Sequence, residues 1–139
     1  MSFRKQVIDD LGGFDENFLG PAVGEDAEFS HRVGKAGLIH YTPAAHLVHL
    51  KAPGGGARDE VGQARYVWQM AFCVNYFWYK VDAPWRLRCG MMLRAFRQQV
   101  VNRRTIRNGG WLRFALAFLR GVRDSERVIR QLRGRVGAR

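Results

Sequence analysis

Gly24-Glu25-Asp26-Ala27-Glu28-Phe29-Ser30-His31-Arg32 is the stretch on which the interpretation of the whole chain depends. It places two adjacent carboxylates at the start of a predicted helix, because Phe29, Val33 and Ala36 recur at helical spacing and Gly37 follows them. Glu28 and Arg32 fall on the opposite side of this helix, in the i,i+4 order that favours an ion pair. The helix dipole stabilises acidic residues in a first turn, so capping alone explains the pair. A chemical role for the carboxylates therefore depends on the sequence around them.

The flanking sequence predicts a short helix before this stretch and two short strands after it. Residues 2–11 carry apolar side chains at four-residue spacing and are followed by Gly12-Gly13, a typical helix end. The predicted strands are 38–41 and 44–50, and a glycine-rich loop follows at 53–58. We therefore expect residues 1–60 to adopt an α/β fold with short strands.

Beyond Asp59 the spacing of apolar residues becomes helical for the rest of the chain. Breaks at Asp82-Ala83-Pro84 and Asn108-Gly109-Gly110 divide it into predicted helices of about 60–80, 84–107 and 111–133. The sequence thus predicts two regions, an α/β unit at 1–60 and a mainly α-helical, basic region at 61–139.

The net charge of +11 is unevenly distributed along the chain. Residues 1–83 hold eight basic and ten acidic side chains, whereas residues 84–139 hold fifteen arginines and two acidic side chains. A field of one sign attracts polyanions, either an anionic membrane surface or a nucleic acid. Because the aromatic residues lie in apolar runs and no nucleic-acid recognition motif occurs, the sequence favours the membrane over nucleic acid. Packing of the helices inside the protein is the alternative.

The two cysteines and the longest apolar run bear on location. Cys73 and Cys89 are too far apart in sequence for a Cys-x-x-Cys site, so we interpret them as reduced thiols. The longest uncharged, mostly apolar run, 66–79, has fourteen residues, whereas a membrane span needs about 20. No apolar run follows the basic residues near Met1, so we expect no signal peptide. We expect a cytoplasmic protein that binds peripherally at the inner face of the cell membrane.

An ordered series of short motifs carries a family resemblance. It comprises Leu11-Gly12-Gly13-Phe14-Asp15-Glu16, then Gly24-Glu25-Asp26 with Arg32, then Tyr41-x-Pro43-x-Ala45 with His49. In order and approximate spacing the series resembles the acceptor-side half of family 2 glycosyltransferases. The resemblance implies the GT-A fold and the transfer of a sugar from a nucleotide-sugar donor to an acceptor hydroxyl. Such a reaction would serve cell-envelope or polysaccharide synthesis, with sugar or lipid-linked acceptors.

The resemblance also implies roles for particular residues. Asp26 would be the catalytic base that takes the proton of the acceptor hydroxyl, with Glu25 as its neighbour. His49 would be a ligand of a divalent metal, Mn²⁺ or Mg²⁺, that binds the leaving diphosphate. Gly55 and Arg58 lie in the glycine-rich loop, which is either a mobile lid that reaches the diphosphate or a plain connector.

The resemblance covers residues 1–60 and begins in the middle of the family fold. No Asp-x-Asp sequence, the family's metal-binding motif, occurs in the 139 residues. We therefore expect either a fragment or one part of a split enzyme that lacks the donor-binding half, with a separate donor-binding half as a candidate partner, or a relic of such an enzyme. The alternative is a non-catalytic basic module that binds anionic membrane surfaces.

Overall fold

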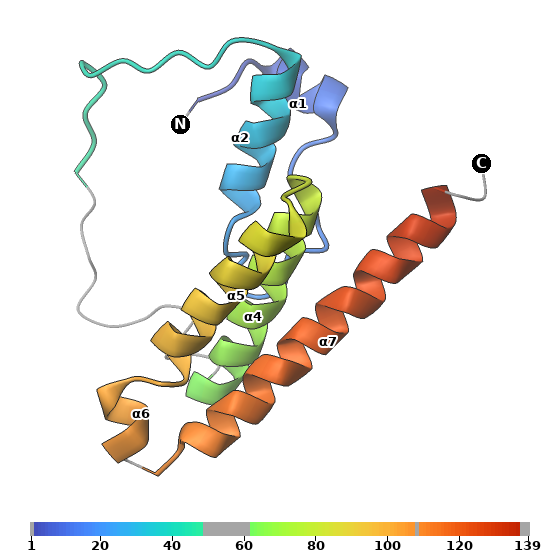
Figure 1. Cartoon of the computed structure of the whole chain (residues 1–139). Coiled ribbons are helices and arrows are strands. Elements are labelled where there is room, and N and C mark those ends of the chain that lie inside the picture. The colour runs from blue at the N-terminus through green and yellow to red at the C-terminus, as the bar shows by residue number, and fades with distance from the viewer. Residues whose placement is uncertain (1, 49–61, 108, 137–139) are drawn as a thin grey trace.

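The described part of the chain consists of helices and the segments that connect them (Figure 1). The structure is a computed structural model that describes residues 2–48, 62–107 and 109–136. The helices are α1 (Lys5–Leu11), α2 (Glu25–Ala36), α4 (Gln63–Lys80), α5 (Trp85–Gln99), α6 (Arg103–Arg107) and α7 (Trp111–Val136).

The α/β fold expected for residues 1–60 is wrong, because no strand forms within the described ranges. Residues 38–48, where both strands were predicted, follow α2 as an irregular connection. Leu38, Tyr41 and Val48 in this segment have relative exposures of 101%, 84% and 82%. β-Branched and aromatic residues favour a strand only where a neighbouring strand pairs with them and covers one face. No described segment pairs with 38–48, so the local preference is not realised.

The helices predicted near the acidic pair and at the end of the chain are confirmed. Helix α1 is followed by Gly12, which has a left-handed backbone with φ of 77°. Helix α2 begins directly after Gly24, and its first turn contains Glu25, Asp26 and Glu28, as the helix dipole favours. In the described residues, no helix combines the length and the apolar character that a bilayer crossing requires.

Helix α4 is the centre of the fold. Helix α7 packs along it and α5 packs beside it, as Figure 1 shows. One apolar cluster joins the three helices and consists of Val67, Ala71, Ala95, Val100, Ala115 and Phe118. A second cluster joins the connection between α1 and α2 to α4 and α7, and consists of Phe18, Phe72, Cys73, Tyr76 and Ile129. The acidic pair at the start of α2 is therefore attached to the helical region through α4.

Helices α4 and α7 approach most closely at Gly121. A Cβ atom at this position would overlap the carbonyl oxygen of Trp68 and would lie 2.9 Å from the Cβ of Ala71. Two hydrogen bonds from α4 to the next turn of α7 fix the register: Trp68 Nε1 donates to Asp124 (3.0 Å), and Asn75 Nδ2 donates to the buried Ser125 Oγ (2.7 Å). Backbone contact and polar pairs together allow one alignment of the two helices.

The helix predicted for 84–107 is divided into α5 and α6. Asn102 Oδ1 accepts a hydrogen bond from the backbone N–H of Thr105 (3.0 Å), and Thr105 Oγ1 accepts one from the N–H of Asn102 (3.3 Å). This reciprocal pair is a capping arrangement that begins a new helix. Apolar spacing continues through the break and so did not reveal it.

Candidate active site

Asp26 and Glu25 stand at the first turn of α2 but face different surroundings. Asp26 is exposed, and its Oδ1 accepts a hydrogen bond from the N–H of Ala27 (2.8 Å). Glu25 is half-buried, and its charge lies close enough to Cys73 to act on that thiol. Burial raises the pKa of Cys73, and the Glu25 carboxylate adds to the rise. Of the pair, Asp26 is the more exposed carboxylate.

Gly24 sets the position from which α2 begins. Its φ of 94° lies in the left-handed region, which favours glycine. A Cβ atom here would also come within 3.3 Å of the Phe77 ring on α4. The start of α2 therefore lies directly against α4, and the backbone ahead of Asp26 has little freedom to shift.

Arg32 joins α2 to the Gly12-Gly13 turn. Its Nη1 donates to the carbonyl oxygen of Leu11 and its Nη2 to that of Gly13, both at 2.6 Å. Its Nε donates to Glu28 Oε1 at 2.9 Å, so the predicted i,i+4 ion pair is confirmed. The guanidinium also lies 4.9 Å from the centroid of the Phe29 ring. The two motifs, which are separated by seven residues in sequence, thus form one unit.

A buried ionic network attaches this unit to α4. Lys80 Nζ lies 2.8 Å from Asp15 Oδ2 and 3.7 Å from Glu28 Oε1. Tyr76 donates a hydrogen bond of 2.8 Å from its hydroxyl to Asp15 Oδ2. The side chain of Glu28 is 1% exposed, and Arg32 together with Lys80 compensates its charge. Buried carboxylates are tolerated only when paired in this way.

The network changes the acidity of its members. Burial alone would raise the pKa of Asp15, but hydrogen bonds from Lys80, Asn17 and Tyr76 outweigh it and hold the pKa at about 2. Burial raises the pKa of Tyr76, and the hydrogen bond to the Asp15 carboxylate raises it further. Asp15 is therefore an ionised anchor and Tyr76 a neutral donor.

Sequence reasoning missed this network. We expected Glu28 on the side of α2 opposite its apolar face, whereas it is buried next to Phe29. A signal was present in the sequence: Lys80 is the one charged residue between Arg65 and Asp82, in a mostly apolar and aromatic stretch. A lone cation in such a helix requires a carboxylate partner.

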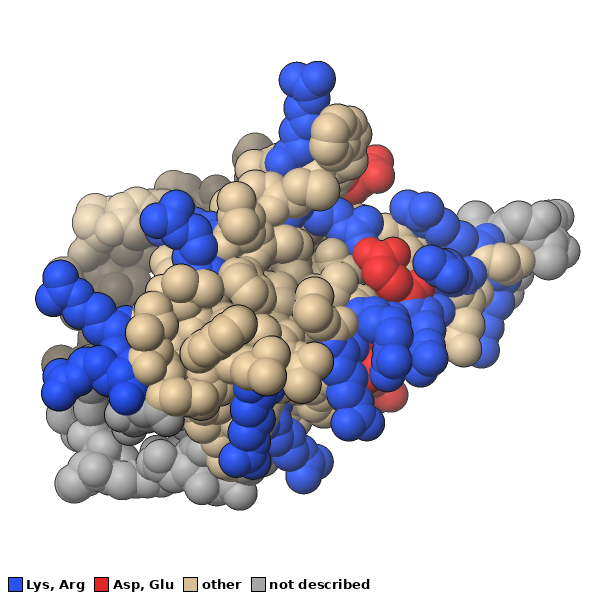
Figure 2. Space-filling model, turned by 60° about the horizontal axis from the view of Figure 1, so that its bottom comes forward, with Lys and Arg blue, Asp and Glu red and all other residues tan. Residues whose placement is uncertain are grey.

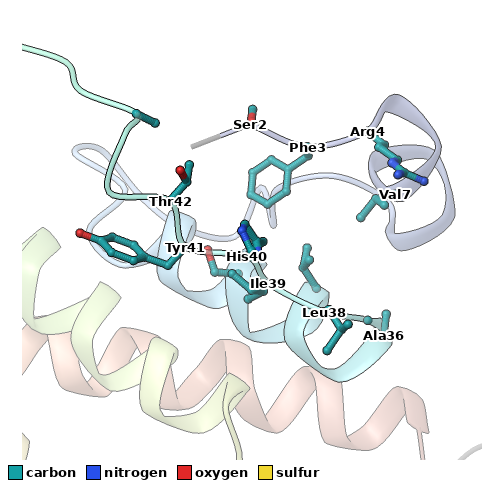
Figure 3. A pocket seen from close by; sticks show the side chains of 14 residues that line it. Ser2, Phe3, Arg4, Val7, Ala36, Leu38, Ile39, His40, Tyr41 and Thr42 are labelled. Atoms are coloured by element: carbon teal, nitrogen blue, oxygen red, sulfur yellow. The ribbon is translucent and has the colours of Figure 1, made fainter.

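A cleft of about 900 Å³ lies beside α2 (Figure 3). The segment before α1, the C-terminal half of α2 and the connection after it form its walls. Figure 3 shows Phe3 and His40 facing each other across the space, with Arg4 at the start of α1. Glu25 and Asp26 do not line this cleft, so it is separate from the candidate base.

The remaining predicted site residues, His49, Gly55 and Arg58, lie outside the described residues. Among the side chains that are described, no three His, Cys, Asp or Glu residues come close enough together to hold a metal ion. The divalent metal implied by the resemblance stays a prediction, and no chemical step is assigned to it.

Comparisons with family models, curated proteins and solved structures found no match. The resemblance to family 2 glycosyltransferases therefore rests on the motifs of the sequence.

Proposed function

We propose that this chain supplies the acceptor-side, base-bearing corner of a family 2 glycosyltransferase. Asp26 is the residue that takes the proton, and Glu25 is its neighbour without a direct role. The proposal concerns the unit formed by residues 11–32 and requires no sheet in the described ranges.

The contacts of Arg32 are the observation that supports this proposal most directly. The hydrogen bonds of Arg32 to Leu11 and Gly13 hold together two of the motifs on which the family resemblance depends. A helix start that served capping alone would need no such link. The link leaves Asp26 exposed while Glu28, two residues later, is buried.

The chemistry asked of Asp26 is a single proton transfer. The acceptor oxygen attacks the anomeric carbon of the donor sugar, the bond to the nucleotide diphosphate breaks, and the hydroxyl proton moves to Asp26. General-base catalysis of this kind contributes about 10²–10⁴-fold to a rate. A donor-binding half, in the same or another polypeptide, has to present the nucleotide sugar.

We propose that the reaction takes place in the cytoplasm at the inner face of the cell membrane, on a sugar or lipid-linked acceptor. A second candidate function, a basic module that binds membranes without catalysis, is favoured by the exposed leucines and arginines of the last helices.

The test replaces Asp26 by Asn in the gene of the cells that produce the protein, so that any native donor-binding partner is present. Extracts are supplied with radiolabelled nucleotide sugars, and incorporation into lipid-linked and polymeric products is measured. We expect a product that is present in the parent and at least 100-fold weaker in Asp26→Asn.

Asp9→Asn is the matched control, because Asp9 is an exposed carboxylate on α1 with no proposed role. Its extract should match the parent. Equal incorporation by the parent, the Asp26→Asn strain and a deletion strain would disprove the proposed function.

A further inference from the structure

The outer face of α7 changes character along its length. Leu112, Leu116 and Leu119 follow each other at i, i+4 and i+7, and their relative exposures are 56%, 61% and 60%. The buried face of the same helix carries Ala115 and Phe118, which belong to the core. Single exposed apolar side chains are normal on a protein surface, whereas a contiguous row of them indicates an interaction site.

More exposed apolar side chains lie close to this leucine row in the chain. They are Val101 between α5 and α6, Ile106 in α6, and Trp111 at the start of α7. Figure 1 shows α6 and the first turns of α7 at the same end of the molecule. We call these six residues and the arginines named below the leucine–arginine face.

Arginines accompany these residues without any acidic side chain among them. No Asp or Glu occurs between Asp82 and Asp124, and five exposed arginines of this stretch are Arg94, Arg97, Arg103, Arg107 and Arg113. Among the described residues, no ion pair engages these five, whereas Arg88 pairs with Glu126. Figure 2, which looks onto this end, shows a broad uncharged area with Lys and Arg side chains around its margin.

We propose that the leucine–arginine face docks on the surface of an anionic phospholipid bilayer. Aliphatic side chains enter the boundary between headgroups and acyl chains, while arginine stems extend along it and place their guanidinium groups on lipid phosphates. The charge of the margin is mostly positive and so complementary to such a surface. The inference specifies the membrane location proposed above but does not depend on sugar transfer, so either can fail alone.

The side chains distinguish a bilayer from other polyanions. Nucleic acids are bound through phosphate contacts together with aromatic stacking, whereas five of the six apolar residues of this face are Leu, Ile or Val, and the sixth is Trp111. An acidic protein partner would have to offer an apolar centre within an anionic margin. An anionic bilayer offers an apolar interior and a negatively charged surface together, over an area as large as the protein face requires.

The experiment measures sedimentation of the full chain with vesicles of phosphatidylcholine alone or with 30% phosphatidylglycerol. We expect binding to the anionic vesicles only, weakening as NaCl is raised, because screening reduces the attraction. Leu116→Gln with Leu119→Gln should lower the partition coefficient about ten-fold or more. Leu38→Gln with Leu47→Gln, two leucines elsewhere that are even more exposed, should leave it unchanged.

A second pair of variants separates local from net charge. Arg103→Gln, Arg107→Gln and Arg113→Gln together should lower partitioning, by roughly five-fold for each arginine. Arg4→Gln, Lys5→Gln and Lys35→Gln remove the same charge from exposed sites near α1 and α2 and should have a much smaller effect.

Three results would overturn the proposal. One is equal binding to neutral and anionic vesicles, or to neither. Another is equal loss of partitioning in the two triple variants. The third is a different occupant of the leucine–arginine face. It would be detected either as a dimer that the Leu116→Gln, Leu119→Gln variant dissociates, or as binding to double-stranded DNA that is stronger than binding to vesicles. Circular dichroism with thermal unfolding shows that each variant is folded.

Discussion

The guanidinium of Arg32 donates a hydrogen bond of 2.6 Å to the carbonyl oxygen of Gly13, nineteen residues earlier in the chain. With the bond to Leu11 it holds the turn after α1 against α2. A planar guanidinium spreads five N–H donors over three nitrogen atoms and so reaches two carbonyls and one carboxylate on different sides, whereas the donors of an ammonium radiate from a single atom.

Arg32→Lys is therefore expected to loosen the turn while the rest of the fold stays intact. Amide hydrogen exchange at residues 11–17 should speed up by at least ten-fold, since two charge-assisted hydrogen bonds are lost. Lys35→Gln, an exposed change in the same helix, is the control and should leave exchange at these amides as in the parent. Unchanged exchange in Arg32→Lys would show that the turn is held by other contacts.

Asp15 makes stability depend on pH in the acid range. Its pKa is about 2 in the folded protein and 3.8 ordinarily, so the ionised form stabilises the fold. The contribution, about 2 kcal/mol, is complete above pH 4 and is lost as the pH falls through 2.

Urea unfolding at a series of pH values measures this contribution. Lys80→Met removes the cation nearest to Asp15 and should reduce the slope of unfolding free energy against pH between 4 and 2. If parent and variant have the same slope, the ion pair does not set the acidity of Asp15.

Gly121→Ala is expected to destabilise the protein by about 1–3 kcal/mol, because the new methyl group meets the backbone of Trp68. Gly134→Ala is the matched control: it lies in the same helix and has nothing within 4 Å of a new Cβ. There the change should stabilise by up to about 1 kcal/mol through helix propensity. Equal shifts of both variants in thermal unfolding would contradict the close approach of α4 and α7.

The two thiols are expected to differ in reactivity. Cys89 is exposed, whereas Cys73 is buried, donates from Sγ to the carbonyl of Leu19 (3.3 Å) and has a raised pKa. A chromogenic disulfide reagent at pH 8 should react with one thiol within minutes and with the second only on unfolding. The Cys89→Ser variant should lose the fast phase. Rapid reaction of both thiols in the parent would show that the second core cluster is open.

The helices could be predicted from sequence because their signals are local. Apolar spacing and glycines located α1, α2, α4 and α7 to within a few residues. The strands could not be predicted correctly, because a strand exists only through a partner and the sequence of 38–48 does not say whether one is present. The break at Asn102 depended on a side-chain cap hidden in a continuous apolar pattern.

The candidate site divides in the same way. Exposure of Asp26 and the pairing of Glu28 with Arg32 follow from helical spacing, and the pairing was predicted. The burial of Glu28 and its contact with Lys80 depend on how α2 meets α4, fifty residues later in the chain. The packing of α2 against α4 is a tertiary contact, and no local sequence pattern predicts it.

The missing side chain at Gly121 has a mechanical consequence. Since α7 lies against the backbone of α4 at this point, a shift by one turn would bring the side chain of Ala117 or Ser125 into the space that only glycine fits. The two helices therefore move as one rigid unit, and the ion pairs of Lys80 with Asp15 and Glu28 attach the start of α2 to this unit. If α7 rests on a bilayer, Asp26 stands at a constant height above it. An acceptor anchored in the same bilayer would then be selected by how far its hydroxyl projects.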